Sequence, residues 1–241
     1  MRIANILRKV LRRLVPNNSV EKALGVDICE SGVMQNAIEL WHNMYKNEPP
    51  WRGGKDNVIP LNLPAAISEE FARLILTEFS MEVTGSPMAA FINEQLKDQL
   101  TDLNKFVEMY CAGGAIAVKP FVTNIDENGK PTAIELDFVK AVDFFPCAFN
   151  NKGEITAAVF VEGKKIGDYL YTRLEYHELT GMTYTIINKA FKSEEIYQYN
   201  DDGTYAVRDR FRKEVPLSEV DEWAGLSEEP VTVSYTHLTL P

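Results

Sequence analysis

Histidines are the residues of this sequence best suited to bind a metal or to carry protons near neutral pH. There are three of them, His42, His177 and His237. They are far apart along the chain, and none belongs to an HExxH motif or to another spacing that is typical of a metal site. We therefore expect His42 and His177 to lie on the polar faces of their elements, and we predict no metal site.

Two acidic pairs are the next candidates, because paired carboxylates can act as acid/base couples or as magnesium ligands. They are Asp126 with Glu127 and Asp201 with Asp202. A glycine follows each pair within two residues, which is the composition of a tight turn. We interpret both pairs as the tips of hairpins.

Glycines that could cradle a phosphate group are also in the wrong context. Gly53, Gly54 and Lys55 follow two prolines instead of a strand, and no GxxxxGK[ST] motif is present. Gly113 and Gly114 precede a predicted strand, whereas the glycines of a dinucleotide site lead from a strand into a helix. No GxSxG nucleophile turn occurs. We accordingly predict no catalytic residue, no cofactor site and no cofactor.

Composition and charge describe the kind of protein that these residues belong to. The 241 residues are 45% hydrophobic and 25% charged, which is typical of a packed globular chain. The net charge of −10 argues against a general basic surface for DNA phosphates. Cys29, Cys111 and Cys147 form no recognisable disulfide framework or CxxC site, and no apolar run is long enough to cross a bilayer. These features favour a reducing cytoplasm.

The first half of the chain has helical periodicity. Residues 2–14 alternate apolar and basic side chains as in a basic amphipathic helix, which Pro16 ends. Further helices are predicted over residues 34–45, 64–79, 86–96 and 103–110. Pro64 suits a first helical turn, and Ser86 with Pro87 suits the start of the next helix. Trp41, Tyr45 and Trp51 flank a proline turn, where we expect core packing ahead of a role as an interface anchor.

The second half has the period of strands. Alternation of apolar and polar residues predicts strands over residues 115–122, 134–138, 155–161, 169–178 and 183–189, with a turn at Asn150–Gly153. Helices followed by strands indicate an α+β fold with a mostly antiparallel sheet. We divide the chain into an N-terminal basic helix (1–16), a helical region (17–112), a β-rich region (113–232) and a tail (233–241).

Several blocks of sequence resemble portal proteins of long-tailed bacteriophages and prophages of Gram-positive bacteria. The helical blocks are ELWHNMYKNEPPW and NLPAAISEEFARLILTEFSMEVTGS. The strand blocks are AGGAIAVKPFV, IELDFVKAVDFFPCAFNNKGEITAAVFVE, YTRLEYHEL and YTIINKAFKS. Together they cover roughly residues 30–200 in the order of the family. Residues 233–241, VSYTHLTLP, depart from it and resemble translated sequencing adaptor, so we expect this tail to be non-native and the chain to be the truncated N-terminal part of a longer protein.

The resemblance implies a subunit of a homo-oligomeric ring, commonly a dodecamer, at the capsid portal vertex of the virion. Such a ring nucleates head assembly in the host cytoplasm, and double-stranded DNA passes through it during packaging and ejection without sequence-specific binding. The implied partners are the terminase, the capsid and scaffolding proteins, and the head-completion proteins. The protein would not be an enzyme, because ATP hydrolysis would belong to the terminase. We expect this part of the chain to form the outer, wing-like region of the subunit.

Two alternatives remain open on the residues alone. The basic helix 2–14 could dock the protein on an anionic membrane surface or on an acidic partner, which would make it an adaptor. Alternatively, the acidic turns could hold a metal in a metal-dependent nuclease. Because Pro16 separates residues 1–14 from the rest, we expect their deletion to leave the fold intact.

Overall fold

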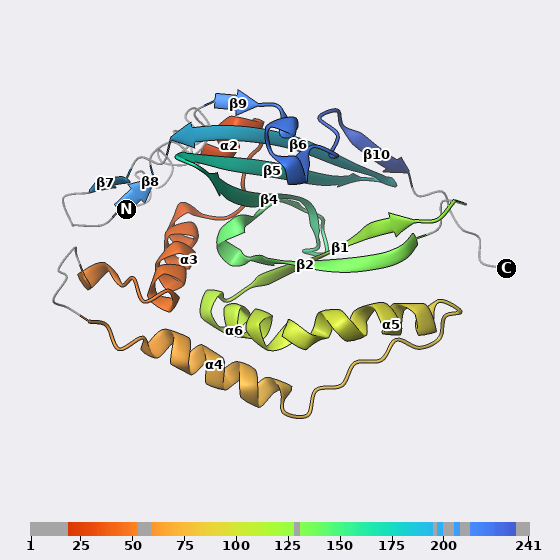
Figure 1. Cartoon of the computed structure of the whole chain (residues 1–241), viewed down its shortest axis with the longest axis horizontal. Helices are drawn as coiled ribbons and strands as arrows, with labels where there is room; N and C mark the ends of the chain where they lie inside the picture. The colour runs from red at the N-terminus through yellow and green to blue at the C-terminus, as the bar shows by residue number, and fades with distance from the viewer. Residues whose placement is uncertain are drawn as a thin grey trace. The chain divides into compact units, whose positions relative to one another are not determined.

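The computed structural model describes residues 19–52, 59–127, 131–194, 197–199, 205–207 and 213–234. The fold is α+β with mostly antiparallel sheets, as the sequence predicted. Two compact units make up the chain (Figure 1). We call Gly32–Phe144 the helix–hairpin unit, and the described residues before and after it the sheet unit. The predicted helix over residues 2–14 lies outside the described residues.

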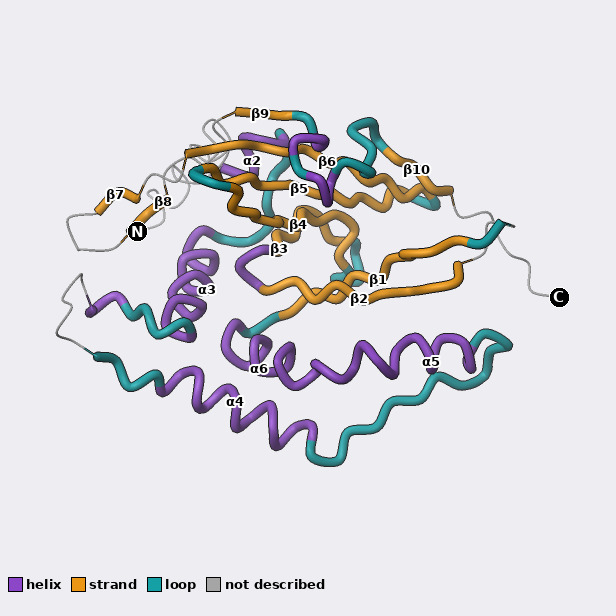
Figure 2. Tube along the Cα trace, in the orientation of Figure 1, coloured by secondary structure: helices purple, strands orange, loops and turns teal. Residues whose placement is uncertain are grey.

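Four helices form most of the helix–hairpin unit (Figure 2). They are α3 (Gly32–Tyr45), α4 (Leu63–Leu76), α5 (Ala89–Gln99) and α6 (Leu103–Gly113). Short 3-10 turns occur at η1 (Pro50–Arg52), η2 (Leu100–Asp102) and η3 (Ala141–Asp143). Helix α6 lies at the centre of the unit and packs on α3, α4 and the hairpin. These four helices confirm the sequence prediction.

Local signals explain where these helices begin and end. Pro64 lies in the first turn of α4, where a missing N–H is not needed. The hydroxyl of Ser86 accepts a hydrogen bond from the Met88 N–H at 3.2 Å, which caps the entry to α5. Gly114 ends α6 in the left-handed conformation, at φ 77°, and its N–H donates to the Tyr110 carbonyl at 2.8 Å.

A β-hairpin completes this unit, formed by β1 (Ile116–Ile125) and β2 (Pro131–Lys140). Glutamines of α5 bond to the backbone of β2: Gln95 Oε1 accepts from the Ile134 N–H at 3.1 Å, and Gln99 bonds to both the Ile134 carbonyl and the Leu136 N–H. These side chains therefore satisfy backbone groups that a two-stranded ribbon leaves unpaired. The ring of Phe106 stacks on Phe138, with 3.9 Å between centroids, and joins α6 to the same strand.

The sheet unit is built on one antiparallel sheet with strand order β10-β6-β5-β4-β3, and β9 also pairs with β6. Its long strands are β4 (Ile155–Ile166), β5 (Tyr169–Thr180) and β6 (Thr183–Glu194), and its shorter ones are β3 (Phe144–Phe149), β9 (Lys213–Val215) and β10 (Val231–Ser234). Strands β7 (Tyr197–Tyr199) and β8 (Tyr205–Val207) form a separate pair. The unit also includes helix α2 (Ser19–Leu24) and the turns η4 (Leu217–Glu219) and η5 (Asp221–Trp223).

Apolar clusters cover both faces of this sheet. One cluster joins Val20 of α2 to three strand residues, Val159, Leu174 and Phe191. The other joins strand residues to the C-terminal segment and consists of Tyr171, Ala190, Val215, Leu217, Val220 and Trp223. Full burial of side chains of this size contributes roughly 1.5–3 kcal/mol each. Helix α2 and the segment 213–223 therefore act as the covers of the sheet.

The compact units do not follow the predicted division at residue 112. The hairpin β1–β2 belongs with the helices, because α5 and α6 pack on it, whereas α2 belongs with the sheet. The predicted tail also begins inside a strand: in β10, Val233 pairs with Tyr184 and Ser234 with Thr183. Residues 235–241 lie outside the described residues.

Candidate functional site

The histidines occupy different environments from one another. His42 lies half-buried on α3 and lines a small cavity. His177, on β5, shares one face of its strand with the polar side chains of Arg173 and Glu175, as predicted, although it is only 7% exposed. His237 lies outside the described residues. Among the residues that the structure describes, no group of three or more His, Cys, Asp or Glu side chains is arranged to hold a metal ion.

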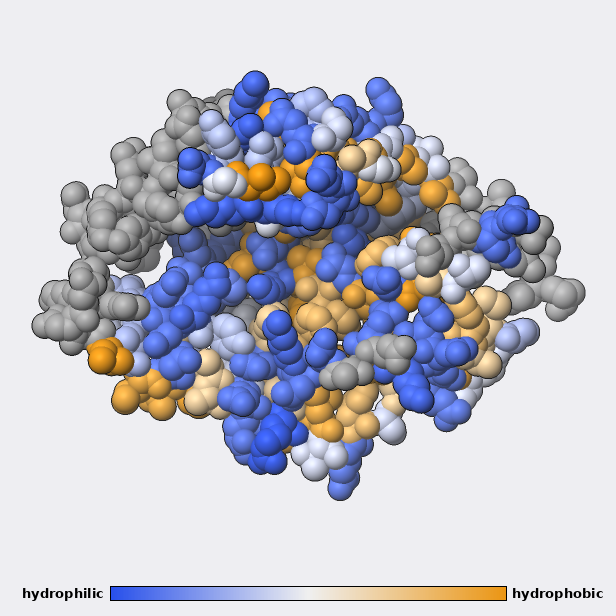
Figure 3. Space-filling model, viewed as in Figure 1, coloured by the Kyte–Doolittle hydropathy of each residue, from blue (hydrophilic) through white to orange (hydrophobic). Residues whose placement is uncertain are grey.

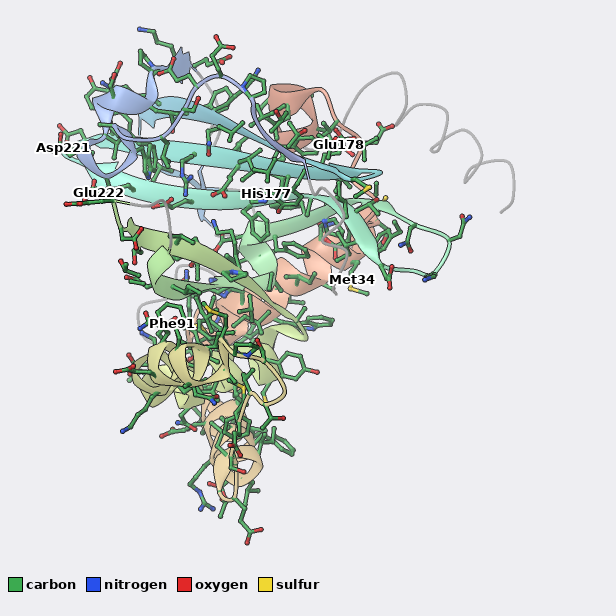
Figure 4. All side chains as sticks on the ribbon, turned by 90° about the vertical axis from the view of Figure 1, so that its right-hand side faces the viewer. Met34, Phe91, His177, Glu178, Asp221 and Glu222 are labelled. Carbon is green, nitrogen blue, oxygen red and sulfur yellow. The ribbon has the colours of Figure 1, made fainter. Side chains whose placement is uncertain are left out.

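His177 belongs to a chain of polar contacts across three strands of the sheet. Its Nε2 lies 2.6 Å from Glu175 Oε1, and its Nδ1 contacts the Tyr184 hydroxyl. The other Glu175 oxygen, Oε2, lies 3.0 Å from Arg173 Nη1, and Arg173 Nη2 lies 2.7 Å from Glu162 Oε2. Figure 4 shows His177 on the sheet, with Glu178 toward one end and Asp221 and Glu222 at the other.

This network accounts for the polar side chains on that face of the sheet. Alternation along β5 places Arg173, Glu175 and His177 side by side, and the register brings Glu162 and Tyr184 against them. Both ring nitrogens of His177 have protein partners, so neither is left to ligate a metal or to accept a proton from another molecule. The network therefore pairs the charged side chains of this face with one another.

The remaining sequence candidates are turns or lie outside the described residues. Asp126 and Glu127 follow β1 in the loop to β2, where a hairpin turn was predicted. Gly113 and Gly114 connect a helix to a strand, also as predicted. Gly53, Gly54, Lys55, Asp201 and Asp202 lie outside the described residues. Asn150 forms its predicted turn, because its Oδ1 accepts from the N–H groups of Lys152 and Glu154.

The aromatic residues beside the proline turn are not core residues. Trp51 is 62% exposed and Trp41 is 41% exposed, so the core packing expected for them is wrong. Tyr45 is half-buried, and its hydroxyl donates to Glu108 Oε1 at 2.8 Å. Burial of the phenol, followed by this bond and the nearby carboxylates, raises the pKa of Tyr45 to about 12. Tyr45 therefore remains a neutral hydrogen-bond donor.

The largest departure from the sequence analysis lies on α4. This helix turns its small residues, Ser68 and Ala72, inward and buries them, and it packs on α6 and α3. Its large apolar residues face outward, and Ile67, Phe71, Leu74 and Ile75 are each 54–55% exposed. Figure 3 shows apolar residues at the surface over this helix. The periodicity of the stripe was read correctly, but it does not face the core.

The exposed apolar surface continues beyond the carboxyl-terminal end of the helix. We define the α4 face as Leu63, Ile67, Phe71, Leu74, Ile75, Phe79 and Met81, all between 47% and 58% exposed. Large side chains that are half exposed each offer on the order of 100 Å². The α4 face thus presents several hundred Å² of apolar surface, a size that marks interaction sites on soluble proteins.

Charged residues border the α4 face on one side of the helix. Arg73 Nη2 pairs with Glu70 Oε1 at 2.6 Å, and Glu69 is exposed beside them. A polar rim around an apolar centre is the usual anatomy of a protein–protein contact. We therefore take the α4 face as the candidate functional site.

Two further findings bear on function. Within the described part of the chain, no helix is long and apolar enough to span a membrane. Comparison with protein-family models, with curated proteins and with solved structures finds no match to this chain.

Proposed function

We propose that the chain is an assembly protein, a subunit of a portal-type ring at a capsid vertex through which DNA is packaged and ejected. The observation that carries the proposal is the α4 face, which places apolar side chains on the outside while small residues hold the helix to its unit. A ring joins one surface of each subunit to a different surface of its neighbour. The α4 face supplies one of the two surfaces that such a contact needs.

The resemblance of the sequence to portal proteins supports the same proposal. The block NLPAAISEEFARLILTEFSMEVTGS spans residues 62–86 and includes all of α4. The surface on which the proposal rests therefore lies within the part of the chain that resembles the family. The α+β order of the described elements is consistent with a wing-like region of such a subunit.

The size of the α4 face is compatible with a specific contact. A standard interface buries about 800 Å² on each partner. The seven side chains of the α4 face, at roughly half exposure, approach that value before their polar rim is counted. A contact centred on Phe71 would also have the aromatic anchor that binding hot spots favour.

The charge of the chain suits a conduit for DNA. With a net charge of −10, the protein as a whole repels phosphates, so DNA can pass without being held. The partners of the intact ring would be the terminase, the capsid and scaffolding proteins, and the head-completion proteins. Hydrolysis of ATP would be the work of the terminase.

Electron microscopy of the concentrated protein tests this proposal. We expect closed rings that disappear in the Phe71→Lys variant, because a charge at the centre of the α4 face must be desolvated in the contact. Ala66→Lys is the matched control, since Ala66 lies on α4 beside the apolar stripe and is also exposed. Rings that persist in Phe71→Lys would exclude the α4 face, and a map with residues 64–110 lining the bore would exclude the wing-like placement.

A further inference from the structure

A small cavity of about 60 Å³ lies within the helix–hairpin unit. Helices α3 and α6 form two of its walls, and the end of β2 with the turn η3 forms the third. Its lining consists of His42, Tyr45, Lys46, Met109, Ala112, Gly113, Lys140, Ala141 and Val142. A cavity needs about 10–15 Å³ to hold one water molecule, so this one has room for a compact polyatomic ion.

Two lysines give this cavity its charge. Neither Lys46 nor Lys140 forms an ion pair with any carboxylate in the described part of the chain. Lys46 directly follows the last residue of α3, and Lys140 is the last residue of β2, so the fold brings them to one site from different parts of the chain. Lysine ammonium groups have three donors and no acceptor, and the lining contains no carboxylate to neutralise their charge.

The pKa of His42 reflects the positive charges of these lysines. Burial, followed by the charges of Lys46 and Lys140, lowers the pKa of His42 to about 4. At neutral pH the imidazole is therefore uncharged and offers one N–H donor. Besides His42 and the two lysines, the lining has one more titratable side chain, Tyr45. Its hydroxyl donates to Glu108, and Glu69 also lies near that phenol. Both carboxylates act on the tyrosine and lie outside the lining.

We propose that this cavity binds a dianionic oxyanion, namely phosphate, either free or as the terminal group of a phosphomonoester. Two ammonium groups match the charge of such a group, which is about −1.5 to −2 at neutral pH. The three oxygens that carry its charge are acceptors only, which complements a lining that offers lysine and imidazole donors. The site is separate from the α4 face and does not depend on the ring proposal.

His42 itself provides the readout. In the full chain at pH 7.5 and constant ionic strength, we expect sodium phosphate to shift the His42 ring resonances in NMR along a saturable curve. Sulfate stays dianionic at lower pH, and we expect it to raise the pH midpoint of His42 by at least one unit above the value in chloride. Glycerol phosphate, a phosphomonoester, distinguishes free phosphate from an esterified phosphate group as the ligand. At pH 7.5 it should shift the His42 resonances as phosphate does only if the cavity admits the ester.

Lysine variants test whether the response of His42 to phosphate comes from binding in the cavity. Lys140→Met and Lys46→Met should each weaken the phosphate response at least fivefold, whereas Lys97→Met, an exposed lysine on α5, should leave it unchanged. The two variants should also raise the His42 midpoint in chloride, which confirms that they fold with the charge removed. Equal shifts in phosphate and in chloride, or a response that survives both substitutions, would overturn the proposal.

Discussion

Glu175 and His177 are two residues apart on β5, and their side chains meet at 2.6 Å between Oε1 and Nε2 on the same face of the sheet. The second oxygen of Glu175 contacts Arg173. One carboxylate thus bridges two basic side chains that are themselves almost buried, which makes it the centre of the polar network.

Removing the charge of Glu175 should therefore destabilise the sheet unit. We expect Glu175→Gln to lower the free energy of unfolding by roughly 1–3 kcal/mol, because Arg173 and His177 lose a charged acceptor while they remain buried. Glu229→Gln, an exposed position in the same unit, is the control and should change stability by less than about 0.5 kcal/mol. Urea denaturation of the three proteins measures the difference, and equal midpoints for the two variants would contradict this account.

At Thr172 we expect a substitution to stabilise the protein, because its buried hydroxyl forms no hydrogen bond within the described part of the chain. The side chain is 1% exposed, and Oγ1 has no hydrogen-bond partner among the described residues. We expect Thr172→Val to raise the free energy of unfolding by up to about 1 kcal/mol, since it removes an unpaired polar group. The reverse change at another buried residue of the sheet, Val159→Thr, should lower it by about 1–3 kcal/mol. Destabilisation by Thr172→Val would show that its hydroxyl has a partner.

Adjacent glycines at the end of α6 should respond differently to alanine. A Cβ on Gly114 would be strained, because the residue has φ 77°, and we expect Gly114→Ala to cost about 1–2 kcal/mol. A Cβ on Gly113 would meet the Ala141 Cβ at 3.6 Å, an ordinary contact, so Gly113→Ala should be neutral or slightly stabilising. Thermal denaturation checks both changes, and similar losses in the two variants would contradict the backbone assignment.

The thiols of the sheet unit should differ in reactivity. Burial raises the pKa of Cys147 to about 12, whereas Cys29 is exposed. The thiolate is the reactive species, and Cys147 stays protonated until the pH approaches that value. At pH 8 we expect iodoacetamide to label Cys29 at least tenfold faster than Cys147, as followed by mass spectrometry of the two peptides. The difference should disappear when the protein is unfolded. Equal rates in the native protein would be inconsistent with the half-buried position of Cys147.

The sequence predicted the elements better than their surroundings. Period and capping residues located α3 to α6 and the long strands, because those signals are local. The orientation of α4 could not be predicted from local signals. The burial of Ser68 and Ala72 depends on the close approach of α4 to α6, and this packing leaves the large apolar residues of α4 on the outside. A strongly apolar stripe alone does not say whether its partner belongs to the same chain.

The surroundings of His177 could be predicted only in part. The spacing of Glu175 and His177 on a strand places both on one face, which was a usable signal. The contact with Tyr184 depends on the register of the hairpin, and the burial of this face depends on distant segments. The cover formed by Leu217, Val220 and Trp223 consists of two 3-10 turns, which are too short to give a recognisable sequence pattern, so it was not predicted.

The native mass of the protein in solution tests the central claim most directly. Light scattering over a wide range of concentration should give a mass well above the 27.3 kDa of one chain. Phe71→Lys should return it to a single chain while Ala66→Lys does not, because only the first places a charge within the α4 face. A wild-type protein that stays at 27.3 kDa up to millimolar concentration would contradict the assembly role.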